Sequence, residues 1–200
     1  MNETDADETR DGADAGGGRD TAPDDLCTSV VTISSDRSLE EDPAGDMIAT
    51  VLEEAGHEIA VREHVGSAHD KVQSIVSRQI DRDDVDIVIT AGGTSVEPDD
   101  VTLEAVEPLL EKELTPFGEL FTALAYERVG TRVVTARTLA GIAKGSGTPV
   151  FCLPGVADVA RIGLEEIVLS EAAAIVDLAR EDEPDTDEDA PEADATNGGA

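Results

Sequence analysis

The sequence predicts an α/β fold: a three-layer sandwich in which a mostly parallel sheet is covered by helices on both faces. Two observations lead to this prediction. Short, strongly apolar segments alternate along the chain with longer segments whose apolar residues recur at helical spacing. The short segments are nearly continuous in their apolar character, which is typical of parallel strands buried on both faces.

The first half of the chain contains the clearest helix signals. Asp42 and Pro43 predict the start of a helix, as its N-cap and its first helical residue, and Gly56 predicts its end. The other elements expected in this half are strands near residues 30–33, 57–65 and 85–90 and an amphipathic helix near residues 72–80.

In the second half, a glycine-containing loop follows the third strand directly, and the alternation of helices and strands continues. We expect helices near residues 101–110, 117–129 and 157–179 and strands at residues 139–143 and 149–153, the latter two joined by residues 144–148. No internal repeat is present.

The two ends of the chain have a different composition from its centre. Residues 1–26 carry nine acids and two bases, and residues 181–200 carry nine acids and no base. Because both segments are almost free of large apolar residues, we predict that they are disordered acidic tails. Residues 27–180 are then expected to form one domain.

Charge and composition also bear on the class of protein. The formal net charge is −32, and only three of the 14 basic residues are lysines. A surface of this kind indicates a protein of a salt-accumulating cell, where screening tolerates the repulsion; an ordinary soluble acidic protein is the alternative. Nucleic-acid backbone binding, which needs a basic footprint, is excluded.

The expected compartment is the cytoplasm. No apolar run approaches the length of a membrane span, and the N-terminus lacks the features of a signal peptide. Cys27 and Cys152 are isolated, and His57, His64 and His69 form no metal-binding pattern.

The loop Gly92-Gly93-Thr94-Ser95 is the best candidate for a ligand site. It follows the third strand, and ligands of such folds bind at the carboxyl ends of the strands. Glycines allow a phosphate to approach the backbone, successive amides form an anion nest, and Thr94 and Ser95 add hydroxyl donors. The alternative is an ordinary turn between a strand and a loop, because the motif matches neither a Walker loop nor a dinucleotide fingerprint.

Two aspartates follow strands on the same predicted edge. Asp42 follows the first strand, and Asp100 follows the glycine loop by five residues. Together they could hold a Mg²⁺ ion that carries triphosphate oxygens. Helix capping is the alternative role for each, and one carboxylate can cap a helix and still present an oxygen to a ligand.

Two further segments precede helices and are candidates for ligand contact. Phe117-Gly118-Glu119 is expected to open a helix with an acid in its first turn, and Leu153-Pro154-Gly155 precedes the last helix, whose free amides suit an anion. Favourable placement of an acid near a helix dipole and a rigid proline turn are the respective alternatives.

These segments together resemble the molybdopterin adenylyltransferase family, which is related to the molybdopterin-binding G domain of gephyrin. The resemblance runs from about Val30 to Asp177. It rests on five short motifs in order: Asp42-Pro43-Ala44-Gly45, Gly92-Gly93-Thr94, Asp100-Val101-Thr102, Phe117-Gly118-Glu119 and Leu153-Pro154-Gly155.

The resemblance implies a function in molybdenum-cofactor biosynthesis: Mg²⁺-dependent transfer of AMP from ATP to molybdopterin. It implies that Asp42 and Asp100 are catalytic and hold the metal. It further implies a homo-oligomer (trimer or hexamer) and transfer of the product to a separate molybdenum- or tungsten-insertion protein. The residues expected to bind molybdopterin are Gly92, Gly93, Thr94, Ser95, Gly118, Glu119, Pro154 and Gly155.

The chain departs from the family pattern at four positions. The family loop usually reads Thr-Gly-Gly-Thr-Gly, whereas here it begins with Ala91 and ends with Ser95. Ala125 and Ala136 stand where relatives carry serine. These changes leave open an alternative function, a non-catalytic molybdopterin-binding module. A molybdenum-insertion protein fits less well, because such proteins carry additional domains.

Overall fold

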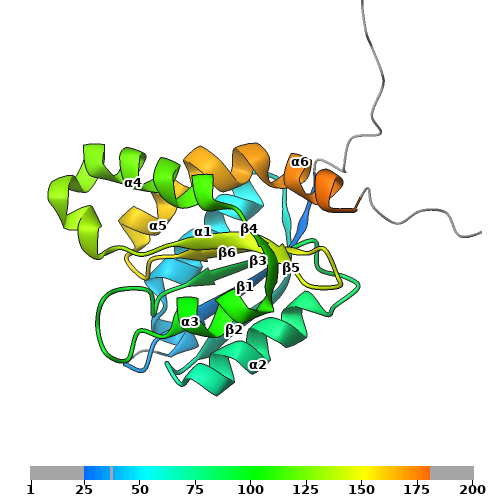
Figure 1. The fold of residues 1–200 in the computed structure, drawn as a ribbon, viewed down its shortest axis with the longest axis horizontal. Helices are drawn as coiled ribbons and strands as arrows, with labels where there is room; N and C mark the ends of the chain where they lie inside the picture. The colour runs from blue at the N-terminus through cyan, green and yellow to red at the C-terminus, as the bar shows by residue number, and fades with distance from the viewer. Residues whose placement is uncertain (1–24, 37, 181–200) are drawn as a thin grey trace, which may run out of the picture.

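The fold is a six-stranded mixed sheet between two layers of helices (Figure 1). The computed structural model describes residues 25–36 and 38–180, and the sheet has the order β2-β1-β3-β6-β5-β4. The strands are β1 (Cys27–Ile33), β2 (Glu58–Val65), β3 (Ile87–Ala91), β4 (Leu110–Glu113), β5 (Leu139–Ala143) and β6 (Pro149–Leu153).

The predicted acidic tails lie outside the described residues, except for Asp25 and Leu26. Leu26 is only 1% exposed and belongs to the hydrophobic core. The predicted boundary at residue 27 therefore assigned one core residue to the tail.

The sheet is mostly parallel, as predicted. β1 runs parallel to β2 and β3, and β3 runs parallel to β6. β5 is antiparallel to both of its neighbours, β6 and β4. β5 and β6 form a hairpin, because the five residues between them are too few for the crossover that a parallel pair requires.

The edge strand β4 was not predicted. The helix expected near residues 101–110 is instead α3 (Thr102–Val106), followed by the single turn η2 (Glu107–Leu109) and then by β4. Pro108 lies inside the expected helix. Since proline has no amide hydrogen and its ring crowds the preceding turn, the α-helix cannot continue, and after η2 the chain becomes extended from Leu110.

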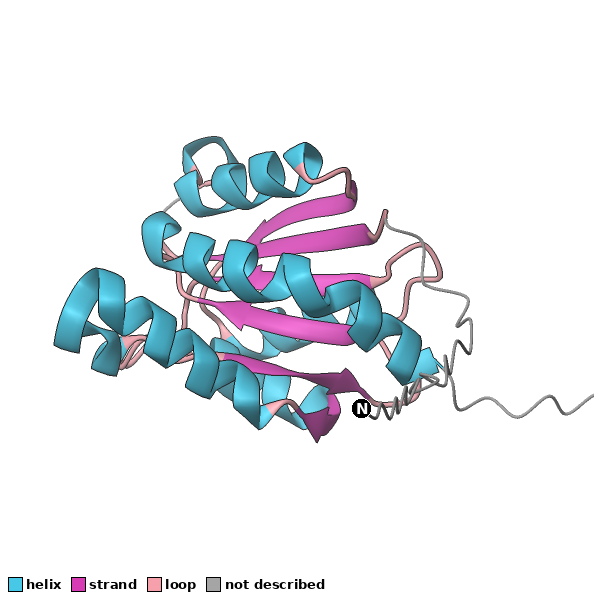
Figure 2. Cartoon of the chain, turned by 90° about the horizontal axis from the view of Figure 1, so that it is seen from above, coloured by secondary structure: helices cyan, strands magenta, loops and turns pink. Residues whose placement is uncertain are grey.

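Helices cover both faces of the sheet, which confirms the three-layer prediction (Figures 1 and 2). On one face, α2 (His69–Ile80) and α3 pack against the sheet. The other face carries α1 (Pro43–Glu54), α4 (Thr115–Val129), α5 (Ala157–Gly163), the π-helical turn η4 (Leu164–Val168) and α6 (Leu169–Arg180). The remaining helical turns are η1 (Leu39–Glu41) and η3 (Gly130–Thr135).

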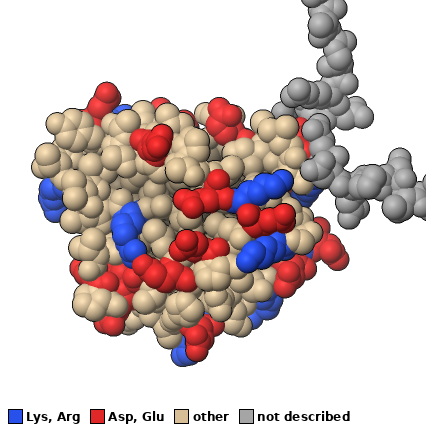
Figure 3. Space-filling model, viewed as in Figure 1, with Lys and Arg blue, Asp and Glu red and all other residues tan. Residues whose placement is uncertain are grey.

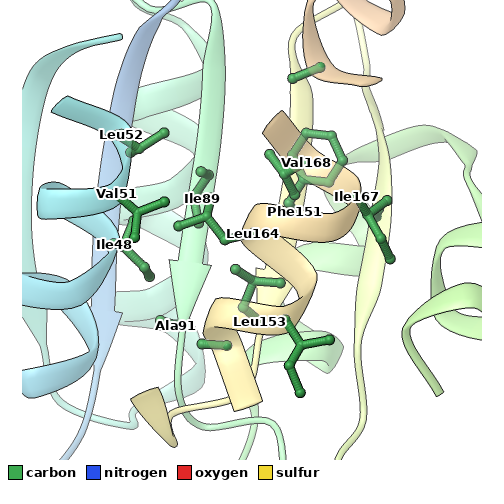
Figure 4. Packing of buried hydrophobic residues seen from close by; sticks show 14 of the residues in the cluster. Ile48, Val51, Leu52, Ile89, Ala91, Phe151, Leu153, Leu164, Ile167 and Val168 are labelled. Carbon is green, nitrogen blue, oxygen red and sulfur yellow. The ribbon is translucent and has the colours of Figure 1, made fainter. Parts of the chain in front are cut away.

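The larger hydrophobic core lies between the sheet and the helical layer of α1, α4, α5, η4 and α6. Ile48 and Leu52 of α1 face Ile89 of β3, with Leu164 beside them (Figure 4). All four side chains have at most 1% of their surface exposed. Each contributes about 1.5–3 kcal/mol relative to an exposed side chain. This packing fixes α1, and with it the position of Asp42 at the start of the helix.

Acidic side chains are spread over the visible surface and interleave with fewer basic ones (Figure 3). Within the described ranges, no helix is both long enough and apolar enough to span a bilayer.

Candidate functional site

A cavity of about 370 Å³ opens at the carboxyl ends of β1, β3 and β6. This is the edge at which parallel α/β sheets bind ligands. The cavity lies at the end of β1, which has β2 on one side and β3 on the other, so the order of the strands reverses there. Its lining residues are Thr32, Ile33, Ser34, Asp36, Asp42, His64, Thr94, Ser95, Glu97, Asp100, Thr135, Ala136, Pro154, Gly155 and Val156. The structure therefore brings together six predicted site residues: Asp42, Thr94, Ser95, Asp100, Pro154 and Gly155.

Gly92 and Gly93 do not line this cavity, although we predicted that they bind the ligand. Both have positive φ angles, +99° and +62°. A Cβ on Gly92 would collide with the carbonyl oxygen of Ile33, and a Cβ on Gly93 would collide with the Thr102 hydroxyl. These glycines allow the loop to turn close to its neighbours, which lets Thr94 and Ser95 reach the cavity.

Hydrogen bonds hold the glycine loop to the start of α3. The Thr102 hydroxyl donates to the Gly92 carbonyl at 2.8 Å, and the Thr102 amide donates to the Gly93 carbonyl at 2.9 Å. The loop is further tied to β6, because the Gly92 amide donates to the Leu153 carbonyl at 3.0 Å. These hydrogen bonds to α3 and β6 hold the loop in one conformation without a ligand.

Asp42 is both the predicted helix cap and part of a polar network. Its Oδ1 accepts a hydrogen bond from the Gly45 amide at 2.9 Å, which caps α1. Its Oδ2 accepts hydrogen bonds from the Thr32 hydroxyl at 2.7 Å and from Arg62 Nη2 at 3.2 Å. The residue is only 4% exposed. Both carboxylate oxygens therefore already have protein donors.

Arg62 of β2 joins Asp42 to a second acid at the start of α1. The guanidinium contacts Asp46 Oδ1 at 2.7 Å as well as Asp42. Partial burial lowers the pKa of Arg62, but the hydrogen bonds to Asp46 and Asp42 outweigh it and raise the pKa above its ordinary value. Arg62 stays charged and neutralises part of the negative charge beside the cavity.

Asp100 closes the loop that begins at the glycines. Its Oδ2 accepts a hydrogen bond from the Ser95 amide at 2.8 Å. It does not cap the following helix, since the N-cap position of α3 is occupied by Val101. The capping role that we considered for Asp100 is therefore wrong. Within the described part of the chain, Asp100 Oδ1 has no hydrogen-bond partner in the protein.

Arg137 clamps the same loop from the segment before β5. Its Nε donates to the carbonyls of Thr94 and Ser95 at 2.9 and 3.0 Å, and its Nη2 donates to the Asp100 carbonyl at 3.2 Å. Its Nη1 pairs with Glu104 at 2.5 Å. The hydrogen bond from Arg137 lowers the pKa of the Glu104 carboxyl.

Gly118 and Glu119 lie outside the cavity lining. They belong to α4, which begins at Thr115 after the N-cap Leu114, and the first turn of α4 contains no acid. The expectation that Glu119 stands in the first turn is wrong, because Pro116 lets the helix begin earlier. Glu119 is exposed, and Gly118 lies near the Thr138 hydroxyl.

Pro154 and Gly155 connect β6 to α5 at the cavity edge. A Cβ on Gly155 would lie 2.9 Å from the Cα of Gly92. The two loops that follow β3 and β6 therefore pack backbone to backbone, which keeps the cavity walls together.

Several lining residues were not predicted from the sequence, among them Thr32, Asp36, His64 and Glu97. The register of the sheet could have indicated two of them. Thr32 and His64 are paired at the carboxyl ends of neighbouring parallel strands. No local signal marks Arg137, whose role depends on a contact across 37–43 residues of sequence.

The cavity is acidic, with four carboxylates in its lining and no lysine or arginine among the lining residues. A phosphate-bearing ligand would therefore need a cation to offset the repulsion. Nowhere in residues 25–36 and 38–180 do three or more His, Cys, Asp or Glu side chains form a group that could hold a metal by themselves. Mg²⁺ commonly binds one or two carboxylates and completes its shell with water and substrate phosphates. Asp100 suits that mode, because no residue that the structure describes donates to its Oδ1.

A known domain family matches most of the chain, including the segments that line the cavity. Residues 29–174 match the model of a probable molybdopterin binding domain. The chain belongs to the molybdopterin-binding domain family.

Curated relatives support this assignment over most of their length. The chain is 36% identical to molybdenum cofactor biosynthesis protein B of Bacillus subtilis over 162 residues, which cover 80% of this chain and 94% of the relative. It is 32% identical to the protein of the same name in Escherichia coli over 146 residues, covering 73% and 85% respectively.

Solved structures share the fold. A crystal structure of a molybdenum cofactor biosynthesis protein B has 34% sequence identity to this chain and a TM-score of 0.75. The superposition covers 79% of this chain and 98% of that protein. The tungsten cofactor synthesizing protein of Pyrococcus furiosus has 35% sequence identity to this chain and a TM-score of 0.71. The superposition covers 80% of this chain and 100% of that protein.

The departures from the family motif differ in their relation to the cavity. Ser95 and Ala136 line it, so the added Cβ at Ser95 and the lost hydroxyl at Ala136 alter its surface. Ala125 of α4 is fully buried in the hydrophobic core and is not among the residues that line this cavity. Alanine there is a packing residue, and a hydroxyl at this position would not reach a ligand in the cavity.

Proposed function

We propose that this chain acts in molybdenum-cofactor biosynthesis by binding molybdopterin and transferring the adenylyl group of ATP to it, with Mg²⁺ as the metal. The observation that carries the proposal is the acidic cavity at the carboxyl edge of the sheet, with Thr94, Ser95 and Asp100 in its wall. Membership of a molybdopterin-binding family supports the choice of pterin ligand.

In the proposed reaction, an oxygen of the molybdopterin phosphate attacks the α-phosphorus of ATP. The bond between the α-phosphorus and the bridging oxygen breaks, and pyrophosphate leaves with that oxygen. No covalent intermediate with the protein is needed, so the chain acts by positioning the two substrates and stabilising charge. The hydroxyls of Thr94 and Ser95 are suited to bind the phosphate oxygens.

Asp100 is the carboxylate best suited to hold Mg²⁺, since its Oδ1 accepts from no donor among the described residues while the Ser95 amide orients its Oδ2. The metal would supply neutralisation of the triphosphate charge. Asp42, the second predicted ligand, has donors on both oxygens and would need to exchange one of them to bind a metal directly. Without that exchange, Asp42 would support the site by fixing Thr32 and α1.

A second candidate function is a molybdopterin-binding module without transferase activity. Ser95 and Ala136 favour it, because both alter the cavity wall relative to the family motif. Under either function, we propose a cytoplasmic homo-oligomer that hands its ligand to a separate metal-insertion protein.

Product formation tests the proposal. The full chain is incubated with molybdopterin, ATP and Mg²⁺ in high salt, and adenylyl-molybdopterin and pyrophosphate are measured; reactions lacking molybdopterin or treated with EDTA are the controls. We expect both products in equal amounts only in the complete reaction. Molybdopterin binding without either product would reject transferase activity and favour the binding module.

A further inference from the structure

His64 is the one lining residue of the cavity whose side chain carries a nitrogen. It lies near the end of β2 and pairs in register with Thr32 of β1. Arg62 lies two residues earlier on β2, so its side chain projects from the same face of the sheet as that of His64. Because the Arg62 guanidinium reaches Asp42, the imidazole of His64 lies on the α1 side of the sheet, where Thr32 and Asp42 form the cavity wall.

The imidazole has an unsatisfied polar atom. Nε2 of His64 is buried and has no hydrogen-bond partner within the described residues. The other two histidines are engaged: His57 Nδ1 accepts from the Leu26 amide at 3.1 Å, and His69 contacts Asp70 and the Glu104 carbonyl at 3.1 and 3.3 Å. Buried polar side-chain atoms rarely lack a partner, which makes an unpaired one at a cavity wall a candidate for ligand contact.

The charge of the cavity makes this nitrogen distinctive. Asp36, Asp42, Glu97 and Asp100 all contribute carboxylates to the lining, and carboxylates repel a phosphate. The Thr32 hydroxyl is already used, since it donates to Asp42. The imidazole of His64 is the only lining side chain that can present an N–H donor and carry a positive charge.

We propose that His64 is a binding residue that donates a hydrogen bond from Nε2 to a phosphate oxygen of the ligand in this cavity. The inference rests on the proposed function, because that function supplies the phosphate. Two sources share this chemistry: the phosphate ester of molybdopterin and the triphosphate of ATP.

Calorimetric titration of the full chain tests the role of His64, with molybdopterin and with ATP plus Mg²⁺ in separate experiments. His64→Leu removes both ring nitrogens, and His64→Gln retains an amide donor. His69→Gln is the matched control, because His69 lies outside the cavity lining. For at least one ligand we expect the Kd to rise about tenfold or more in His64→Leu and less in His64→Gln. His69→Gln should bind as the parent does.

Nitrogen NMR of the imidazoles provides a readout that does not depend on whether His64→Leu folds. The chain contains three histidines, so the His64 signals are identified as those missing from His64→Gln. We expect the Nε2 resonance of His64 to shift on addition of the ligand whose affinity depends on it, and those of His69 to stay in place.

The outcomes separate this inference from the proposed function. If the parent binds either ligand while His64→Leu and His64→Gln bind equally well and the His64 resonance does not move, the role of His64 is refuted and the proposed function stands. If the parent binds neither molybdopterin nor ATP, both fail. An effect confined to one ligand supports the inference and identifies the source of the phosphate.

Discussion

Asp42 and Arg62 form an ion pair between the start of α1 and the edge strand β2, with Oδ2 and Nη2 3.2 Å apart. The Asp42 side chain is 5% exposed and that of Arg62 is 25% exposed. The same Oδ2 accepts the Thr32 hydroxyl, so one oxygen atom connects two strands and a helix beside the cavity.

Asp42→Asn should therefore destabilise the protein even though asparagine caps helices as well as aspartate. The amide can still accept from Gly45, but it loses the charge that faces Arg62. We expect a loss of about 1–3 kcal/mol in the free energy of unfolding, measured by denaturant titration. Asp46→Asn is the matched control, because Asp46 pairs with the same guanidinium from an exposed position. It should cost less than about 1 kcal/mol, and equal losses in both variants would contradict this assignment.

The second prediction concerns Gly92, in the loop that follows β3, which packs closely against its neighbours. Gly92→Ala should cost roughly 3 kcal/mol or more, because it combines a positive φ with a collision against the Ile33 carbonyl. Gly145→Ala isolates the conformational part, since Gly145 has a φ of +79° and open space around it. It should cost about 1–2 kcal/mol. If thermal and denaturant unfolding show the same loss for both variants, the steric role of Gly92 is wrong.

Arg137 should control ligand affinity by holding the loop from Thr94 to Asp100. Arg137→Met leaves three carbonyls without their donor, so we expect a loss of about 1–3 kcal/mol in stability and weaker binding of molybdopterin. Arg161→Met removes an arginine whose pair with Glu165 lies on the surface of the α5 region, and it should leave binding unchanged. Retention of parental affinity by Arg137→Met would show that the loop keeps its shape without the clamp.

The Arg137–Glu104 pair also predicts a pH dependence. Since the hydrogen bond from Arg137 lowers the pKa of Glu104 in the folded protein, the pair stabilises the fold above the ordinary glutamate pKa. This stabilisation is lost as the pH falls through the lowered pKa. The difference in stability between the parent and Glu104→Gln should therefore be present at neutral pH and shrink in acid. A difference that stays constant down to pH values below about 4 would refute this linkage.

Much of the fold could be predicted because apolar periodicity and capping residues are local signals. Asp42, Pro43 and Gly56 mark the ends of α1 within its own sequence. The missed strand β4 has no comparable signal, since three of its four residues are charged and exposed, and only Pro108 indicates that the preceding helix ends. The direction of β5 could have been inferred from its five-residue connection to β6.

The site was predicted less completely because its walls come from segments distant in sequence. Thr94, Ser95 and Asp100 could be predicted from strand ends and polarity. Gly92 and Gly93 look like ligand-binding glycines in the sequence; in the structure they lie outside the cavity lining, where Gly92 packs against the Ile33 carbonyl and Gly93 against the Thr102 side chain. His64 lines the cavity because of the register between β2 and β1, and Arg137 holds the loop through a tertiary contact. The residues next to them in the sequence give no sign of either role.

Turnover of Asp100→Asn, compared with the parent and with Asp42→Asn, tests whether Asp100 holds the metal for adenylyl transfer. We measure formation of adenylyl-molybdopterin with saturating molybdopterin, ATP and Mg²⁺, after confirming the fold and molybdopterin binding of each variant. We expect Asp100→Asn to remain folded and to bind molybdopterin, because the Ser95 amide still has an oxygen acceptor. Its turnover should fall about 10²-fold or more, equivalent to about 2.7 kcal/mol of transition-state stabilisation. Asp42→Asn should lose turnover to a similar extent only if Asp42 exchanges a protein donor for the metal. Near-parental turnover by Asp100→Asn would refute the assignment of the catalytic Mg²⁺ to Asp100.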